Sequence, residues 1–209
     1  MFDISNIFLQ IFNYELSYLE FFAVITALAA VYVTSLGKVE GFYIGLVNNV
    51  LYFIFFYQCQ LYSVMFLQVA YFTISSFGIY SWLKPDANKQ LLKITRLTKK
   101  QWILVSVAIL LATVIWSSLV LWLSGKYPDH IEQPQYPYID ALITMISVCG
   151  QLILARKKID NWILWMVVNG SSIVLYAVIG IYFTSILCAV LLVIAIRAYI
   201  TWNKMMKAQ

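Results

Sequence analysis

The chain has 209 residues, of which 63% are hydrophobic, 17% aromatic and only 11% charged, and its formal net charge is +5. In an average soluble domain roughly a quarter of all residues are charged, so this composition cannot supply a surface that faces water. It excludes a soluble enzyme and a nucleic-acid-binding domain, and it predicts an integral membrane protein.

Stretches without Asp, Glu, Lys, Arg or His indicate the membrane helices, because a helix needs about 20 residues to cross the hydrocarbon core. In chain order these stretches cover residues 21–37, 41–83, 101–125, 141–155 and 161–196. The second and the last are each long enough for two helices joined by a tight turn. The sequence therefore predicts an all-α membrane fold with seven transmembrane helices.

Polar loops between these stretches divide the chain into segments. We interpret the first of these segments, residues 1–17, as a short interfacial helix on the outer side of the membrane. The predicted segments are an outer interfacial segment at 1–17, a first three-helix bundle at 18–84, a basic cytoplasmic loop at 85–100, a linking helix at 101–124, an outer loop at 125–137, a second three-helix bundle at 138–204 and a cytoplasmic tail at 205–209.

The basic residues predict the orientation, because Lys and Arg in short loops mark the cytoplasmic side. The loop after the third predicted helix contains Lys84, Lys89, Lys93, Arg96, Lys99 and Lys100. Alternation through the membrane then leaves Lys126 as the one basic residue outside. We expect the N-terminus outside and the C-terminus in the cytoplasm, and we interpret the net charge of +5 as a consequence of this topology.

The chain also repeats itself at an offset of 120 residues. The offset aligns rare polar and Trp positions: Glu40 with Asp160, Asn49 with Asn169, Tyr62 with Tyr182, and Trp82 with Trp202. One helix separates the two three-helix copies, so both copies have the same orientation in the membrane. This predicts a parallel 3+1+3 repeat, as in SWEET transporters, and favours a translocation path between the bundles.

The sixth predicted helix carries the main candidate site. Trp162, Trp165 and Asn169 are spaced i, i+3 and i+7, so they share a helix face, which Ser172 and Tyr176 extend. Two Trp rings and an amide can hold an aromatic, cationic ring and bond its polar substituents. The alternative is that the first Trp belongs to the aromatic belt at the membrane interface.

The first copy carries a related but unequal face. Where the sixth helix has Trp165, the second helix has Gly45, and Asn48 and Asn49 lie one turn further. This asymmetry predicts one off-centre pocket. Other uncharged polar side chains are predicted to line it, namely Gln68, Tyr71, Ser75 and Gln151. Alternatively, such side chains join helices to one another.

Few charges lie deep inside the predicted spans, and this limits the mechanism. Proton- or sodium-coupled carriers usually place an ionisable residue at membrane depth. Here Arg197 is the one charge set inside a span, and its side chain can snorkel to the interface. The sequence therefore predicts a facilitator without ion coupling. The cysteines have no metal-like spacing, and we expect no metal or cofactor.

These motifs resemble the PnuC family of bacterial nicotinamide riboside transporters. The resemblance rests on Trp162-x-x-Trp165-x-x-x-Asn169 after Asp160-Asn161, and on residues 45–48, 58–62 and 67–68, and it runs from about Glu20 to Lys204. It implies facilitated diffusion of an unphosphorylated vitamin precursor across the bacterial inner membrane. A cytoplasmic kinase would trap the product. By resemblance, Trp162, Trp165, Asn169 and Gln68 would line the site.

Two positions depart from the family pattern. Members often carry Asn in the third and seventh helices where this chain has Ser75 and Arg197. Thiamine, also a cationic aromatic, and deoxynucleosides therefore remain alternative substrates within the superfamily. The partners implied are the vitamin, the kinase and membrane lipid. A homo-oligomer is left open, and no nucleic-acid partner is expected.

Overall fold

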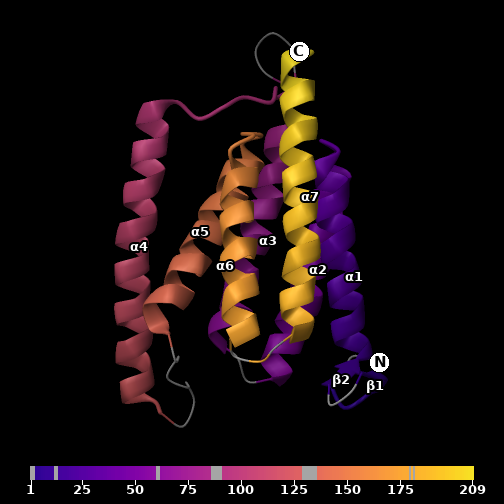
Figure 1. Cartoon of the computed structure of the whole chain (residues 1–209), viewed down its shortest axis with the longest axis vertical. Coiled ribbons are helices and arrows are strands. Elements are labelled where there is room, and N and C mark those ends of the chain that lie inside the picture. The colour runs from indigo at the N-terminus through magenta and orange to yellow at the C-terminus, as the bar shows by residue number, and fades with distance from the viewer. Residues whose placement is uncertain are drawn as a thin grey trace. The chain divides into compact units, whose positions relative to one another are not determined.

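The computed structural model describes residues 3–11, 14–59, 62–85, 91–128, 136–178, 180 and 182–209. These residues form a small β-hairpin and seven helices (Figure 1). The elements are β1 (Ile7–Ile11), β2 (Tyr14–Ser17), α1 (Tyr18–Ser35), α2 (Glu40–Gln58), α3 (Tyr62–Leu83), α4 (Lys99–Lys126), α5 (Pro137–Ala155), α6 (Asn161–Val178) and α7 (Tyr182–Lys207).

Six of these helices are long and apolar enough to cross a membrane, and only α2 among the described helices falls outside that set. Its 19 residues include Glu40, Asn48, Asn49 and Gln58, which lower its hydropathy. The prediction of seven helices is confirmed, whereas a membrane crossing by α2 stays a prediction. Residues 129–135 of the predicted outer loop and 86–90 of the basic loop lie outside the described residues.

The N-terminal segment is a β-hairpin, so the expectation of a short helix is wrong. β1 and β2 pair antiparallel, with Leu9 opposite Leu16. Branched and aromatic side chains favour extended backbone, and here they outweigh an apolar spacing that also suits a helix. Phe8 packs on Phe21 of α1 at a centroid distance of 4.4 Å, and the Ile4 N–H donates to Gln58 Oε1 at 2.9 Å.

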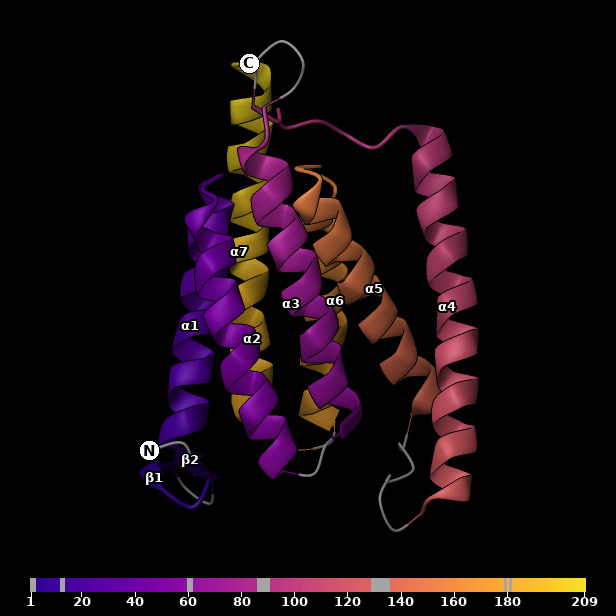
Figure 2. The same ribbon diagram turned by 180° about the vertical axis from the view of Figure 1, so that it is seen from behind.

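The chain forms two compact units, Met1–Tyr80 and Ser81–Gln209. In the first unit α1 and α2 lie side by side and antiparallel (Figure 2). Gly37 makes the turn between them with φ +74°, a conformation that favours glycine. Phe42 of α2 rests against Gly78 of α3, where a Cβ would lie 2.7 Å from the Phe42 ring. Small residues thus allow close helix approach in this unit.

In the second unit, α4 buries one narrow face and exposes the rest. The buried residues are Ile109, Thr113, Ser117 and Ser124, whereas Leu104, Leu111 and Ile115 are exposed. This is the pattern of a helix that packs along one side and meets lipid along the others. The other helices of this unit are α5, α6 and α7, and a turn at residues 156–160 joins α5 to α6 (Figure 1).

A capping box starts α4. The Thr98 hydroxyl accepts from the Gln101 N–H at 3.3 Å, and the Gln101 side chain accepts from the Thr98 N–H at 2.9 Å. We expect Thr98→Ala to lower the free energy of unfolding by about 1 kcal/mol, because it leaves a helix-end N–H without its acceptor. Thermal unfolding in detergent measures this. Thr98→Ser is the control, and equal loss in both variants would contradict the cap.

Helix boundaries recur at the predicted offset. α3 begins at Tyr62 and α7 at Tyr182, 120 residues apart. The turn after α1 uses Gly37, and the turn after α5 uses Lys157, also 120 residues apart, both with positive φ. The internal structure of the two copies therefore supports duplication. Their parallel relation in the membrane stays a prediction.

Candidate functional site

The start of α6 places Trp162 in an aromatic cluster rather than on an open surface. Its ring lies edge-to-face with that of Trp202 on α7, at a centroid distance of 5.6 Å, and Trp202 also contacts Trp82, at 5.7 Å. Trp162 is 1% exposed and Trp202 is 0% exposed. We name Trp82, Trp162 and Trp202 the tryptophan cluster.

Two polar atoms beside the tryptophan cluster have no hydrogen-bond partner among the described residues. They are the Trp162 indole N–H, a donor, and Asn161 Oδ1, an acceptor. A buried unpaired polar group is costly, and it is typical of a site that serves function rather than stability. The Trp82 indole N–H, by contrast, donates to the Leu154 carbonyl at 3.2 Å.

Trp165, about one turn further along α6, lies beside Gly150 of α5. Its Nε1 would lie 3.5 Å from a Cβ built on Gly150, so the glycine leaves room for the indole edge. The ring is half-buried, unlike that of Trp162. The two Trp residues of the motif thus have different neighbours, and Trp165 is the one with ring surface still accessible.

After Trp165, the same face of α6 continues with polar, uncharged side chains. Asn169 is buried, and its Nδ2 donates to the Trp165 carbonyl at 2.8 Å. Ser172 is buried and Tyr176 is half-buried, each on a following turn. Gln151 on α5 is also half-buried, one residue after Gly150. The second unit therefore brings Trp165, Asn169 and their α5 neighbours together.

The first unit holds the other predicted site residues. Asn48 donates from Nδ2 to the Ala23 carbonyl at 2.6 Å and to Thr26 Oγ1 at 3.0 Å, so its amide N–H groups join α2 to α1. Asn49 is buried on the next position of α2. On α3, Gln68 and Ser75 are buried and Tyr71 is half-buried. A substrate role for these residues stays a prediction.

Gly45 of the first unit lies in open space: apart from its chain neighbours and its own helix backbone, no atom of the described residues is within 4 Å of an added Cβ. Its counterpart at the 120-residue offset is Trp165, which fills the matching place in the second unit with a ring. The two copies therefore differ at this position: open space lies beside Gly45 in the first unit, and an indole ring occupies the corresponding position in the second.

The chemistry of these residues suits a neutral or cationic aromatic ligand. Indole rings offer stacking and cation–π contacts, and amides and hydroxyls offer hydrogen bonds. No group of three or more His, Cys, Asp or Glu residues that could hold a metal ion occurs within the part of the chain that the structure describes. Arg197 is exposed on α7.

Sequence reasoning missed the packing role of Trp82 and Trp202. It identified both as equivalent positions of the repeat, but the contacts of Trp202 with Trp82 and with Trp162 join residues that are far apart in the chain. The shared offset and the scarcity of Trp were the signals that could have suggested it.

Comparison with known proteins gives consistent results. The family model described as "Nicotinamide mononucleotide transporter" matches residues 17–204. The nicotinamide riboside transporter PnuC of Escherichia coli K12 is 28% identical, over 96% of this chain and 93% of the relative. The protein of that name from Neisseria mucosa is 27% identical, over 94% and 76%. The crystal structure of a vitamin B3 transporter PnuC aligns with a TM-score of 0.69 and 26% identity, over 91% of this chain and 83% of that one.

Proposed function

Because this chain belongs to the family of nicotinamide mononucleotide transporters, we propose that it carries nicotinamide riboside by facilitated diffusion. It is a multi-pass, all-α membrane protein of a transporter family, and it is not an enzyme. The observation that carries the proposal is the match with a nicotinamide riboside transporter along nearly the whole of both chains.

The chemistry of the substrate fits the α6 face. Nicotinamide riboside has a planar pyridinium ring with one positive charge, and the accessible ring surface of Trp165 can stack on it with a cation–π contribution. Its carboxamide offers N–H donors. The Asn169 amide nitrogen donates to its own helix, so its Oδ1 is the atom we assign to a carboxamide N–H.

The absence of charge on α6 supports the exclusion of a phosphorylated product. Residues 161–178 contain no Lys or Arg. Phosphate binding relies on Arg, Lys or helix N-termini. Along this helix, few groups could offset the free-energy cost of removing water from the phosphate of a nucleotide. Phosphorylation by a cytoplasmic kinase would then remove substrate from the equilibrium and make net uptake one-way.

The topology belongs to the same proposal. We place the seven helices in the bacterial plasma membrane as a parallel 3+1+3 repeat, with the N-terminus outside and the C-terminus in the cytoplasm. The basic residues of the loop before α4, of the α5–α6 turn and of the C-terminal turn of α7 support this orientation. In the first unit the proposed substrate-binding residues are Asn48, Asn49, Gln68, Tyr71 and Ser75, and in the second unit they are those of α5 and α6.

Calorimetric titration of the purified chain tests the substrate. We expect nicotinamide riboside to bind clearly tighter than about 1 mM, and thiamine and thymidine to bind much more weakly. Nicotinamide mononucleotide is the control for exclusion of the phosphate. Preferential binding of thiamine would overturn the substrate and retain the transporter class.

Uptake into proteoliposomes tests the mechanism. Since Glu20, Glu40, Asp140 and Asp160 all lie at or near the starts of their helices, we expect labelled nicotinamide riboside to equilibrate at the same rate with or without a proton or sodium gradient. Enclosing a riboside kinase with ATP should raise accumulation above the external concentration. Concentrative uptake without the kinase would contradict facilitated diffusion.

A further inference from the structure

A short segment before α4 lies across the start of α6. It consists of Ile94, Thr95, Arg96 and Leu97, and we name it the strap. The Thr95 N–H donates to the Lys157 carbonyl at 3.2 Å, and the Ile159 N–H donates to the Thr95 carbonyl at 2.9 Å. The strap therefore extends the α5–α6 turn as a parallel bridge, Thr95 opposite Lys158.

The strap also reaches α7. Arg96 donates to Tyr199 Oη at 3.2 Å and to Asn203 Oδ1 at 3.0 Å, and its guanidinium lies 5.7 Å from the centre of the Tyr199 ring. These Arg96 contacts are exposed, and exposed contacts of this kind contribute little. The Ile94 side chain, by contrast, is buried.

The strongest anchor of the strap is Asp160. Its carboxylate is 3% exposed, and Oδ2 accepts from the Leu97 N–H at 2.6 Å, a short charge-assisted hydrogen bond. Asp160 immediately precedes α6, where a negative charge also meets the positive end of the helix. Asn161 follows, with Nδ2 bonded to the Lys158 carbonyl at 2.6 Å, and then Trp162.

This arrangement differs from an ordinary helix cap. A capping carboxylate accepts from N–H groups of its own helix. Asp160 instead accepts from a backbone N–H 63 residues earlier in the chain. Its counterpart at the 120-residue offset, Glu40, precedes the bulk of α2 in the same way but is exposed. The buried anchor is therefore particular to the copy that holds the Trp motif.

We propose that Asp160 is a positioning residue for transport: its carboxylate holds the strap on the start of α6 and so fixes Trp162 against Trp202. This inference rests on the proposed function, in which α6 binds the substrate. In the proposed orientation the strap lies on the cytoplasmic side, where the substrate leaves. Loss of the anchor frees the first turn of α6, and the Trp motif loses its preorganised geometry.

Hydrogen exchange of the full-length protein in detergent tests the anchor without any substrate. We expect Asp160→Ala to speed exchange at the amides of Thr95, Leu97 and Ile159. Asp160→Asn keeps an acceptor and should retain most of the protection. Glu40→Ala, the matched control from the first copy, should change nothing in these segments. Unchanged protection in Asp160→Ala would overturn the role of Asp160 as anchor.

Binding of nicotinamide riboside tests the positioning. Losing a hydrogen bond to a charged group corresponds to about tenfold or more in an equilibrium constant, so we expect that loss of affinity in Asp160→Ala and recovery in Asp160→Asn. A double-mutant cycle with Trp162→Phe separates positioning from general damage: the two effects should be clearly less than additive. Full affinity in Asp160→Ala despite faster exchange would overturn the positioning role.

The two proposals can fail separately. If the native protein binds no nicotinamide riboside, the proposed function falls, and exchange at the strap and at residues 161–164 alone decides on Asp160. Faster exchange in both segments of Asp160→Ala supports the positioning role of Asp160. Faster exchange in the strap alone overturns that role. If Asp160→Ala does not fold, Asp160→Ser, whose shorter side chain cannot reach the Leu97 N–H, takes its place in each comparison.

Discussion

Replacing Gly41 with alanine should destabilise the protein by about 1–3 kcal/mol or more, because the added methyl meets backbone that cannot move aside. A Cβ at Gly41 would lie 2.6 Å from the Thr34 nitrogen and 2.8 Å from the Ala30 oxygen, and it would overlap Thr34 Oγ1. α2 would have to move away from α1, which also strains the Asn48 bond to the Ala23 carbonyl. Thermal unfolding in detergent should show a lower midpoint and reduced yield.

Gly45→Ala is the matched control, since it makes the same change one turn further along α2. An added Cβ at Gly45 meets no neighbouring side chain or helix within 4 Å in the described part of the chain, and alanine favours the helix over glycine. Unfolding of this variant should match or exceed that of the native protein. If both variants unfold alike, α1 and α2 do not approach as closely as described.

Helix positions were largely predictable because crossing a membrane is a local property of composition. The charge-free stretch 101–125 became α4 (Lys99–Lys126), and the single long stretch 161–196 split into α6 and most of α7. Each stretch reports how much apolar length is available, whatever it packs against. α2 is less clear from composition alone, because its two Asn residues serve helix contacts and a proposed site.

The hairpin was not predictable by the same means. Residues 1–17 carry apolar side chains at intervals that suit a helix as well as a strand, and a segment this short gives periodicity little weight. The pairing of β1 with β2 and the packing of Phe8 on α1 decide the outcome. Both are tertiary contacts, which a window of sequence does not contain.

The neighbours of the proposed site residues were not predictable from the sequence. The spacing of Trp162, Trp165 and Asn169 correctly put them on one helix. It could not show that Trp162 packs on Trp202, because the two residues lie far apart in the chain. In the sequence, Asp160 is distinguished only as the counterpart of Glu40 and as part of the Trp motif, whereas its hydrogen bond is made with a segment 63 residues earlier.

Replacing Trp165 with alanine should weaken nicotinamide riboside binding by roughly 1–3 kcal/mol, or about 5- to 150-fold. The ring is half-buried beside Gly150, so it has a free face to stack on a pyridinium ring, whereas Trp162 is almost wholly covered by its neighbours. Calorimetry of the purified variant measures the change. Trp165→Phe keeps an aromatic face and should recover much of the affinity.

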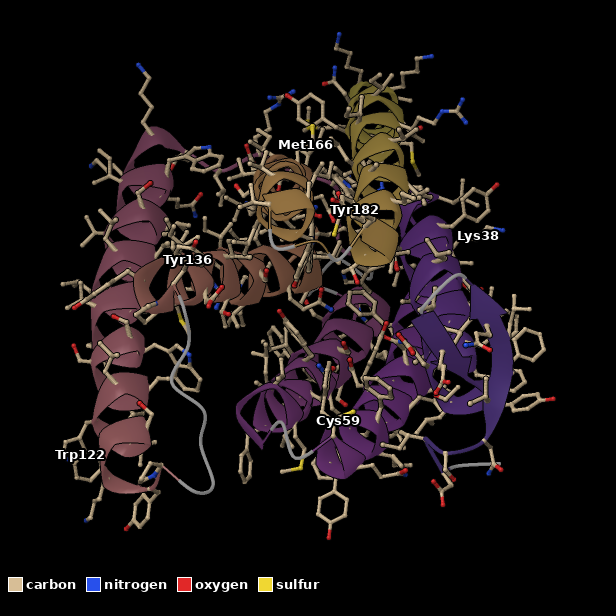
Figure 3. The ribbon with its side chains drawn as sticks, turned by 60° about the horizontal axis from the view of Figure 1, so that its bottom comes forward. Lys38, Cys59, Trp122, Tyr136, Met166 and Tyr182 are labelled. Carbon is tan, nitrogen blue, oxygen red and sulfur yellow. The ribbon has the colours of Figure 1, made fainter. Side chains whose placement is uncertain are left out.

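Trp122→Ala provides the control for loss of a tryptophan in a membrane helix. Trp122 is 58% exposed on the outer side of α4 (Figure 3), and its ring contacts Lys126, 4.9 Å from its centre. Its removal should leave binding and uptake unchanged. Native affinity in Trp165→Ala would instead mean that this ring serves the packing of α6 on α5, and the aromatic contact with substrate would then have to come from Trp162. That would require the tryptophan cluster to open, which Trp202→Phe should make easier.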